Sequence, residues 1–284
     1  MLNALTIDVE DWYHPELVRA HVPASQRFSQ ISTSTHYVLD LLEECGCRAT
    51  FFVVGEVLQD QPDLVTAVLQ AGHELGCHGM SHVPLWDLTP DRLRADLHEF
   101  IATCHAIAPG ASVIGFRAPT FSLDNRTSWA LPILAEFGYR YDSSIFPART
   151  PMYGVAGGPL VPYRPSLQDV AVEDPRGPML EFPMSVWSFL GIRLPICGGF
   201  YLRTLPMALV HHGLRRINQQ RSFTLYAHPW EVYPGTPRWP LPLFARFATY
   251  HHIDAMRQRL ADLISAFRMA PMRDVLEARG DLRL

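Results

Sequence analysis

The stretch Ala49-Thr50-Phe51-Phe52-Val53-Val54 is a nearly continuous apolar run that stops at Gly55. A short run of this kind, bounded by glycine, is typical of a strand covered on both faces. Similar runs alternate with segments of helical periodicity along much of the chain, which is the pattern of parallel βα units. The sequence therefore predicts an α/β fold around a parallel sheet, and its 284 residues fit one large domain, 1–284.

The same reading predicts the other elements. Strands are expected at 4–8, 49–54, 73–77, 113–116, 139–143, 179–183 and 223–227. Helices are expected at 33–45, 62–71, 89–104, 126–137, 205–218 and 247–267, with a turn at 198–201. Two stretches rich in Pro, 145–178 and 229–242, interrupt this pattern, and the first is long enough to indicate an ordered excursion over the functional site.

Composition narrows the class of partner. The formal net charge is −4 and the charged residues, 18% of the chain, are dispersed, which gives no indication of nucleic acid or a membrane surface as partner. No apolar run reaches the ~18 residues of a transmembrane segment. Five cysteines at irregular spacings argue against a disulfide framework, so we expect reduced thiols and a cytoplasmic location. Both a monomer and a homo-oligomer remain open.

Polar residues gather where the predicted strands end. In a barrel of parallel strands the residues beyond the carboxyl ends converge on one face. The residues in such positions are Asp8, Glu10, Asp11, His78, His82, Arg117, Asp142 and His228. We interpret them as one constellation.

His78 and His82 lie four residues apart in a segment containing glycine, a spacing that suits one divalent metal. Two imidazoles and a carboxylate are a set of metal ligands typical of catalytic sites, in which other coordination positions stay open for water and substrate. Along an extended strand Asp8 and Glu10 share a face, which makes Glu10 the natural third ligand. A kink after Ile7 would bring Asp11 there instead.

Hydrolysis of an unactivated amide needs such a metal together with one base and one acid. We assign Asp8 as the base and His228 as the acid. Arg117 is expected to hold the Asp8 carboxylate through a bidentate contact. Asp142 is assigned to the catalytic set and Ser143 to substrate contacts, although a simple capping turn explains these two residues equally well.

Aromatic residues flank these clusters and predict a platform for a sugar, with core packing as the alternative. The assigned substrate residues are Phe121, Trp187, Tyr201 and Trp230. The histidine pairs at 211–212 and 251–252 fall in predicted helices and are interpreted as surface features.

Five segments, in order, resemble the motifs of the polysaccharide deacetylases of the NodB homology class. They are Ala4-Leu5-Thr6-Ile7-Asp8, His78-Gly79-Met80-Ser81-His82, Arg117-Ala118-Pro119, Tyr141-Asp142-Ser143-Ser144 and Leu225-Tyr226-Ala227-His228. The resemblance implies a distorted (β/α) barrel of about seven strands, zinc as the usual metal, and removal of acetyl groups from an N-acetylated glycan. It also implies Asp8 as base and His228 as acid. Common members have two adjacent aspartates in the first motif, whereas Asp8-Val9-Glu10-Asp11 spaces the acids differently.

The Asp-Val-Glu-Asp-Trp opening, the segment 198–203 and the Pro-rich end after His228 are similar to a subfamily associated with exopolysaccharide and exosortase (PEP-CTERM) gene clusters. This similarity implies a C-terminal extension at about 229–284. Two alternative functions are an amidohydrolase of small cyclic amides or imides on the same barrel and a non-catalytic glycan-binding module.

Overall fold

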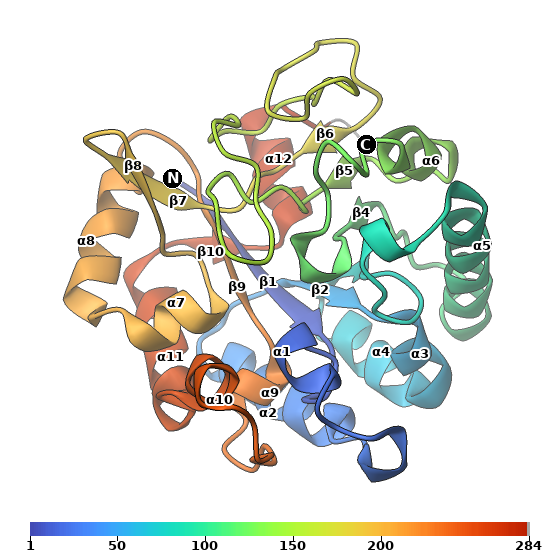
Figure 1. The fold of residues 1–284 in the computed structure, drawn as a ribbon, viewed down its shortest axis with the longest axis vertical. Coiled ribbons are helices and arrows are strands. Elements are labelled where there is room, and N and C mark those ends of the chain that lie inside the picture. The colour runs from blue at the N-terminus through green and yellow to red at the C-terminus, as the bar shows by residue number, and fades with distance from the viewer. Residues whose placement is uncertain (283–284) are drawn as a thin grey trace.

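The computed structural model describes residues 1–282, through which a parallel sheet forms the centre of the fold (Figure 1). The strand order is β10-β1-β2-β3-β4-β5-β6, and β9 also pairs with β1. Within residues 1–282, eight strands make up this sheet: β1 (Asn3–Val9), β2 (Thr50–Val53), β3 (Glu74–Cys77), β4 (Gly115–Phe116), β5 (Tyr141–Asp142), β6 (Leu180–Glu181), β9 (Thr224–Ala227) and β10 (Met269–Ala270). No pairing joins β6 to β9 in this part of the chain, so the barrel stays open there. The predicted distorted (β/α) barrel is confirmed.

The strand at the centre of the sequence argument is covered on both faces, as predicted. Phe51 and Phe52 are both fully buried, yet they belong to different clusters. Phe51 packs with residues of the surrounding helices, whereas Phe52 packs with Tyr141 and Phe182. Successive side chains of a strand point to opposite faces. A strand buried on both faces therefore needs apolar residues at successive positions, as in this run.

Helices surround the sheet. They are α1 (Glu16–Arg19), α2 (Ile31–Glu44), α3 (Gly55–Asp60), α4 (Pro62–Gln70), α5 (Pro90–Ile107), α6 (Ala130–Glu136), α7 (Gly199–Thr204), α8 (Met207–Asn218), α9 (Pro229–Val232), α10 (Leu243–Tyr250), α11 (Met256–Ala266) and α12 (Met272–Arg279). Short 3₁₀ turns occur at Ala24–Gln26, Leu85–Asp87, Pro119–Phe121 and Ile253–Ala255. None of the described helices is both long and apolar enough to cross a membrane.

Two expectations about elements are wrong, and one element was not predicted. The single helix expected at 247–267 is two helices, α10 and α11, because His252 adopts a left-handed backbone (φ 51°) that interrupts the helix. His251 and His252 therefore lie outside both helices. The turn expected at 198–201 leads directly into α7. The hairpin of β7 (Val186–Phe189) and β8 (Ile192–Pro195) was not predicted.

The C-terminal part of the chain is built into the barrel. Met269 and Ala270 of β10 pair with Asn3 and Ala4 of β1. The two-residue β10 carries too short a pattern to be recognised, and it becomes a strand because β1 offers a free edge beside it. The segment after 229 thus contributes to the sheet itself.

Gly115 of β4 occupies a position that leaves no room for a side chain. A Cβ there would lie 2.2 Å from Tyr141 Oη, which is itself fixed by donating to Glu74 Oε1 at 2.9 Å. We expect Gly115→Ala to lower the free energy of unfolding by about 1–3 kcal/mol, measured by urea denaturation. Gly110→Ala is the matched control, since its Cβ meets nothing within 4 Å. Equal losses in both variants would contradict a clash as the cause.

Candidate active site

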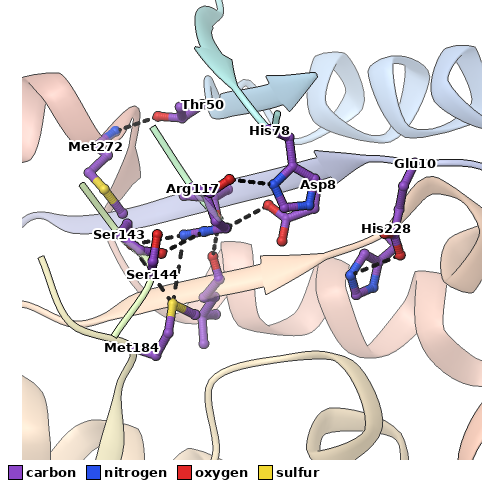
Figure 2. A network of polar contacts seen from close by, with 12 residues as sticks. Asp8, Glu10, Thr50, His78, Arg117, Ser143, Ser144, Met184, His228 and Met272 are labelled. Atoms are coloured by element: carbon purple, nitrogen blue, oxygen red, sulfur yellow. Dashed lines mark hydrogen bonds and ion pairs between the residues drawn. The ribbon is translucent and has the colours of Figure 1, made fainter. Parts of the chain in front are cut away.

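Side chains from distant parts of the sequence meet in one pocket at the carboxyl ends of the central strands (Figure 2). Asp8 belongs to the end of β1 and Glu10 follows it, while His78 follows β3 and His228 follows β9. The pocket has a volume of about 150 Å³, and all four residues line it. Arg117, just beyond β4, lies behind Asp8.

Glu10, His78 and His82 form a cluster able to hold a metal ion. One ligand atom from each lies within 4.8 Å of the others, and all three side chains are buried. Glu10 Oε2 contacts His82 Nε2. Nδ1 of His78 lies 2.8 Å from the carbonyl oxygen of Arg117. A proton on Nδ1 donated to this carbonyl leaves Nε2 with a free lone pair, which is the form that binds metal.

The protonation states of Glu10 and His78 fit a cation. Burial lowers the pKa of His78 to about 4, so the imidazole is neutral. Burial alone would raise the pKa of Glu10, but the positive charges that His82 and His228 can carry outweigh it and hold this pKa well below its usual range. His82 Nδ1 is buried without a hydrogen-bond partner within residues 1–282. A carboxylate and neutral imidazoles are the donor set that Zn²⁺ takes in catalytic sites.

Asp11 lies outside this cluster, so the structure decides between the two candidate carboxylates in favour of Glu10. The Asp11 carboxylate accepts hydrogen bonds from the backbone N–H of Trp12 at 2.9 Å and of Gln30 at 3.0 Å. It holds the loop before α2. The backbone N–H of Asp11 donates to Nδ1 of His14, whose ring stacks on His82 with centroids 5.3 Å apart. His14 was not predicted from the sequence as a site residue.

Arg117 holds the Asp8 carboxylate through one nitrogen, so the bidentate contact expected from the sequence is wrong. Nη1 donates to Asp8 Oδ1 at 2.6 Å and to Thr6 Oγ1 at 2.7 Å. Nε and Nη2 are occupied by the carbonyl oxygen and the hydroxyl of Ser143, at 2.9 and 3.0 Å. The guanidinium also lies 4.3 Å from the centroid of the Phe52 ring. These contacts fix the direction in which Asp8 points.

Ser143 and Asp142 do not line the pocket in the described part of the chain. Ser143 is buried behind Arg117 and donates to the carbonyl oxygen of Phe182 at 2.9 Å. Asp142 Oδ1 accepts from Ser144 Oγ at 2.5 Å. Burial raises the pKa of Asp142, and burial beside Asp142 raises that of Glu181 further. Asp142 and Ser143 thus lie behind the pocket, where β5 pairs with β6, and not in it as predicted.

His228 is held by two carboxylates. Its Nδ1 donates to Glu231 Oε2 at 2.7 Å, and its Nε2 lies 3.4 Å from Glu10 Oε1. Burial by itself would lower the pKa of His228, but Glu10 and Glu231 together raise it to about 9. The imidazole ring stacks on Trp230 with centroids 5.4 Å apart. The ring therefore carries a proton at neutral pH in this environment.

Arg203 and Glu231 line the pocket and were not predicted from the sequence. Glu231 Oε1 accepts from Arg203 Nε at 2.9 Å, and both side chains are buried. The other two guanidinium nitrogens of Arg203 donate to the carbonyl oxygens of His251 and Ala248, at 2.9 and 2.8 Å. The end of α10 is thereby linked to the His228 ring. One signal was available in the sequence: a glutamate three residues after His228 has capping-box spacing.

Two of the four predicted aromatic contacts lie at the pocket. Phe121 and Trp230 line it, and Trp230 Nε1 donates to Glu10 Oε1 at 3.2 Å. Tyr201 packs instead on Phe146, and Trp187 lies in a separate pocket, so their assignment to this site is wrong. Lining residues that were not predicted include Leu17, Thr120, Met152, Tyr153 and Tyr226.

The backbone of the pocket is strained at three positions. His82, Thr120 and Phe121 have φ values of 53°, 57° and 49°, in the left-handed region that residues other than glycine rarely adopt. Strain of this kind persists only where surrounding contacts enforce it, and it clusters at functional sites.

A pH profile tests the link between Glu231 and His228. An acid that donates a proton is active in its protonated form, so activity falls as pH rises through its pKa. Because Glu231 raises the pKa of His228, we expect Glu231→Gln to move the alkaline limb of kcat/KM to lower pH by about 1–2 units, with the same metal supplied to both enzymes. Asp254→Asn, which removes an exposed carboxylate bound to Arg238, is the control. An unmoved alkaline limb in Glu231→Gln would contradict His228 as the acid.

Comparison with known proteins gives a family for each half of the chain. Residues 23–141 match the family model of the polysaccharide deacetylases, and residues 143–277 match a domain of unknown function, DUF3473. A chitooligosaccharide deacetylase of Rhizobium leguminosarum bv. phaseoli is 37% identical over 86 residues, covering 30% of this chain and 38% of that protein. A peptidoglycan-N-acetylglucosamine deacetylase of Bacillus cereus is 42% identical over 65 residues, 23% of this chain and 30% of that protein. The matches thus span well under half the length of these curated relatives.

The fold is shared over nearly the whole chain with a solved structure. A Mycobacterium smegmatis protein assigned provisionally to the polysaccharide deacetylases superposes with a TM-score of 0.60 at 21% identity. The superposition covers 99% of this chain and 90% of that one. Residues 23–141 thus form a polysaccharide deacetylase domain, and a DUF3473 segment follows it at residues 143–277.

Proposed function

We propose that this protein is a metal-dependent hydrolase that removes N-acetyl groups from N-acetylhexosamine residues of a polysaccharide or its precursor. One observation carries the proposal: three kinds of group lie at one pocket. They are the Asp8 carboxylate held by Arg117, the possible metal ligands Glu10, His78 and His82, and the His228 imidazole held by Glu231. The named activities of the Rhizobium and Bacillus relatives support it.

The chain's own residues supply positioning and proton transfer. A divalent ion, most simply Zn²⁺, held by Glu10, His78 and His82 would polarise the amide carbonyl and acidify a water molecule. Asp8, aimed by Arg117, accepts the proton from the attacking water. His228, held by Glu231, gives a proton to the nitrogen of the leaving amine. The amide C–N bond then breaks with acetate and the free amine as products.

The pocket is covered from several sides, which bears on the size of the substrate. Leu17 of α1, Met152 and Tyr153 of the long excursion, Phe200 of α7 and Thr249 of α10 all line it. A volume of about 150 Å³ is small beside the several hundred Å³ typical of ligand sites. We infer that the substrate enters as a terminal sugar or a short precursor. A precursor of an exopolysaccharide agrees with the resemblance of the sequence to that subfamily.

The same small pocket favours a second candidate function, the hydrolysis of a small cyclic amide or imide. The base, the possible metal ligands and the acid serve that reaction equally well, because it also breaks an amide C–N bond. A non-catalytic glycan-binding module is a third outcome for the experiment.

Acetate release separates the three functions. We expect the protein to release acetate from short chito-oligosaccharides, to lose this activity with a chelator and to regain it with added zinc. Turnover of a cyclic imide without acetate release would support the second function. Saturable glycan binding without turnover of either substrate, in the metal-loaded protein, would overturn both enzymatic proposals.

A cytoplasmic location is also proposed. All five cysteines are free thiols in the described chain, and four of them are buried. Reduced cysteines agree with a reducing compartment. Cell fractionation with an antibody to the protein tests this, and recovery in a non-cytoplasmic fraction would contradict it.

A further inference from the structure

A second pocket lies between the β7–β8 hairpin and α8, which run side by side in Figure 1. Its volume is about 160 Å³. Trp187 and Phe189 of β7 form one wall, and Arg216 of α8 and Arg221 form the other. Arg221 precedes β9, whereas His228 follows it, so this pocket lies toward the opposite end of β9 from the candidate active site.

This pocket carries positive charge that no carboxylate of the described residues neutralises. Within residues 1–282, Arg221 Nη2 donates to the carbonyl oxygen of Val186 at 3.0 Å, and Nη1 is buried without a partner. The hydrogen bond of Arg216 goes to the side-chain amide of Gln219, at 3.5 Å. Arg193 of β8 does not line the pocket, but its charge acts on Arg221 and, after burial, lowers the pKa of Arg221, to about 10. In the part of the chain that the structure describes, Arg193 donates to the carbonyl oxygens of Pro147 and Gly158 and to no carboxylate.

A partly buried cation without a counter-ion is costly, and arginine binds carboxylate and phosphate groups through its fork of N–H donors. An oxyanion in this pocket would give a partner to the buried Nη1 of Arg221 and a counter-charge to Arg216. The aromatic wall adds a second requirement. Trp187, which is half-buried, and Phe189, which is 58% exposed, line the same cavity as the arginines. A ligand that satisfies both walls has an oxyanion and a compact body with C–H groups.

We propose that this second pocket binds a sugar-sized anion through its carboxylate or phosphate group, with the sugar ring against Trp187. Two sources share this chemistry, a uronic acid and a sugar phosphate. The proposal does not depend on the deacetylase activity, because none of its residues lines the candidate active site.

Calorimetric titration of the full chain tests the proposal with four probes: glucuronate, glucose 1-phosphate, glucose and inorganic phosphate. We expect saturable binding of at least one anionic sugar and none of glucose at about 10 mM. Binding of glucuronate alone assigns a carboxylate ligand, and binding of glucose 1-phosphate alone assigns a phosphate. Inorganic phosphate binding as tightly as the sugar phosphate would overturn the role of the aromatic wall.

Arg216→Gln is the decisive variant, because Arg216 is exposed and its loss leaves the packing intact. We expect its affinity for the bound anionic sugar to fall by about tenfold or more. Arg215→Gln is the matched control, an exposed arginine next to it on α8 that does not line the pocket. We expect Trp187→Ala to lower the affinity for the anionic sugar while leaving the affinity for inorganic phosphate unchanged. Equal weakening in the two arginine variants, or no binding of either anionic sugar to the folded protein, would overturn the proposal.

Discussion

Asp8→Asn is expected to lower kcat/KM for deacetylation by about 10²–10⁴-fold, the usual contribution of a general base, while the bound metal stays at the level of the unmodified protein. The amide cannot accept the proton of the attacking water. Metal is retained because Asp8 lies outside the cluster of Glu10, His78 and His82. The measurements are steady-state kinetics and elemental analysis of the same preparations.

Asp8 is also the ion-pair partner of a fully buried arginine, so stability must be measured in parallel. Removing one partner of a buried pair costs about 3–5 kcal/mol. Thr6→Val is the matched control, because Thr6 accepts from the same Arg117 nitrogen at 2.7 Å but carries no carboxylate. We expect this control to lose less than about tenfold in kcat/KM. A comparable loss in Thr6→Val would show that the position of Arg117, and not a base at Asp8, limits the reaction.

His78→Ala is expected to remove bound metal and activity together. The substitution deletes one of two imidazoles in the only cluster of three metal-type side chains found in the described residues. Loss of the charge stabilisation that a catalytic ion supplies corresponds to roughly 10³-fold or more in kcat/KM. The protein is dialysed against metal-free buffer and its metal content measured by elemental analysis.

His73→Ala is the matched control for this experiment. His73 is a buried histidine just before β3, as His78 is just after it, and its Nδ1 accepts from the backbone N–H of Ala49 at 3.1 Å. It takes no part in the metal-type cluster. We expect His73→Ala to keep its metal at some cost in stability. Unchanged metal content in His78→Ala would show that the ion is held elsewhere.

Local features of the sequence predicted the elements that place the site. The run at 49–54 indicated a strand buried on both faces, and the structure confirms it as β2. The strand ends were also recognisable, because each apolar run stops at a polar or glycine residue. Convergence of Asp8, Glu10, His78, His82 and His228 on one pocket followed from the general geometry of parallel strands. The long excursion at 145–178 was expected over the site, and its residues Met152 and Tyr153 line the pocket.

The sequence predicted the roles of individual polar residues less well. Ser143 and Asp142 sit at a strand end as the site residues do, yet they bind Arg117 and Ser144 behind the pocket. Trp187 looked like the other aromatic candidates, but an unpredicted hairpin carries it to a different pocket. A strand end determines on which side of the barrel a residue lies, whereas the direction of its side chain depends on the neighbours that pack around it.

By itself, then, the sequence determined the α/β class, the strand ends and the pair of imidazoles, because apolar runs and a four-residue spacing are properties of adjacent residues. Only the tertiary structure decided that Glu10, and not Asp11, lies beside these imidazoles, since the Asp11 carboxylate accepts a hydrogen bond from the backbone N–H of Gln30. Only it revealed that Arg203 supports Glu231 beside His228. These choices rest on contacts between segments far apart in the chain, and such contacts leave no periodic trace in either segment.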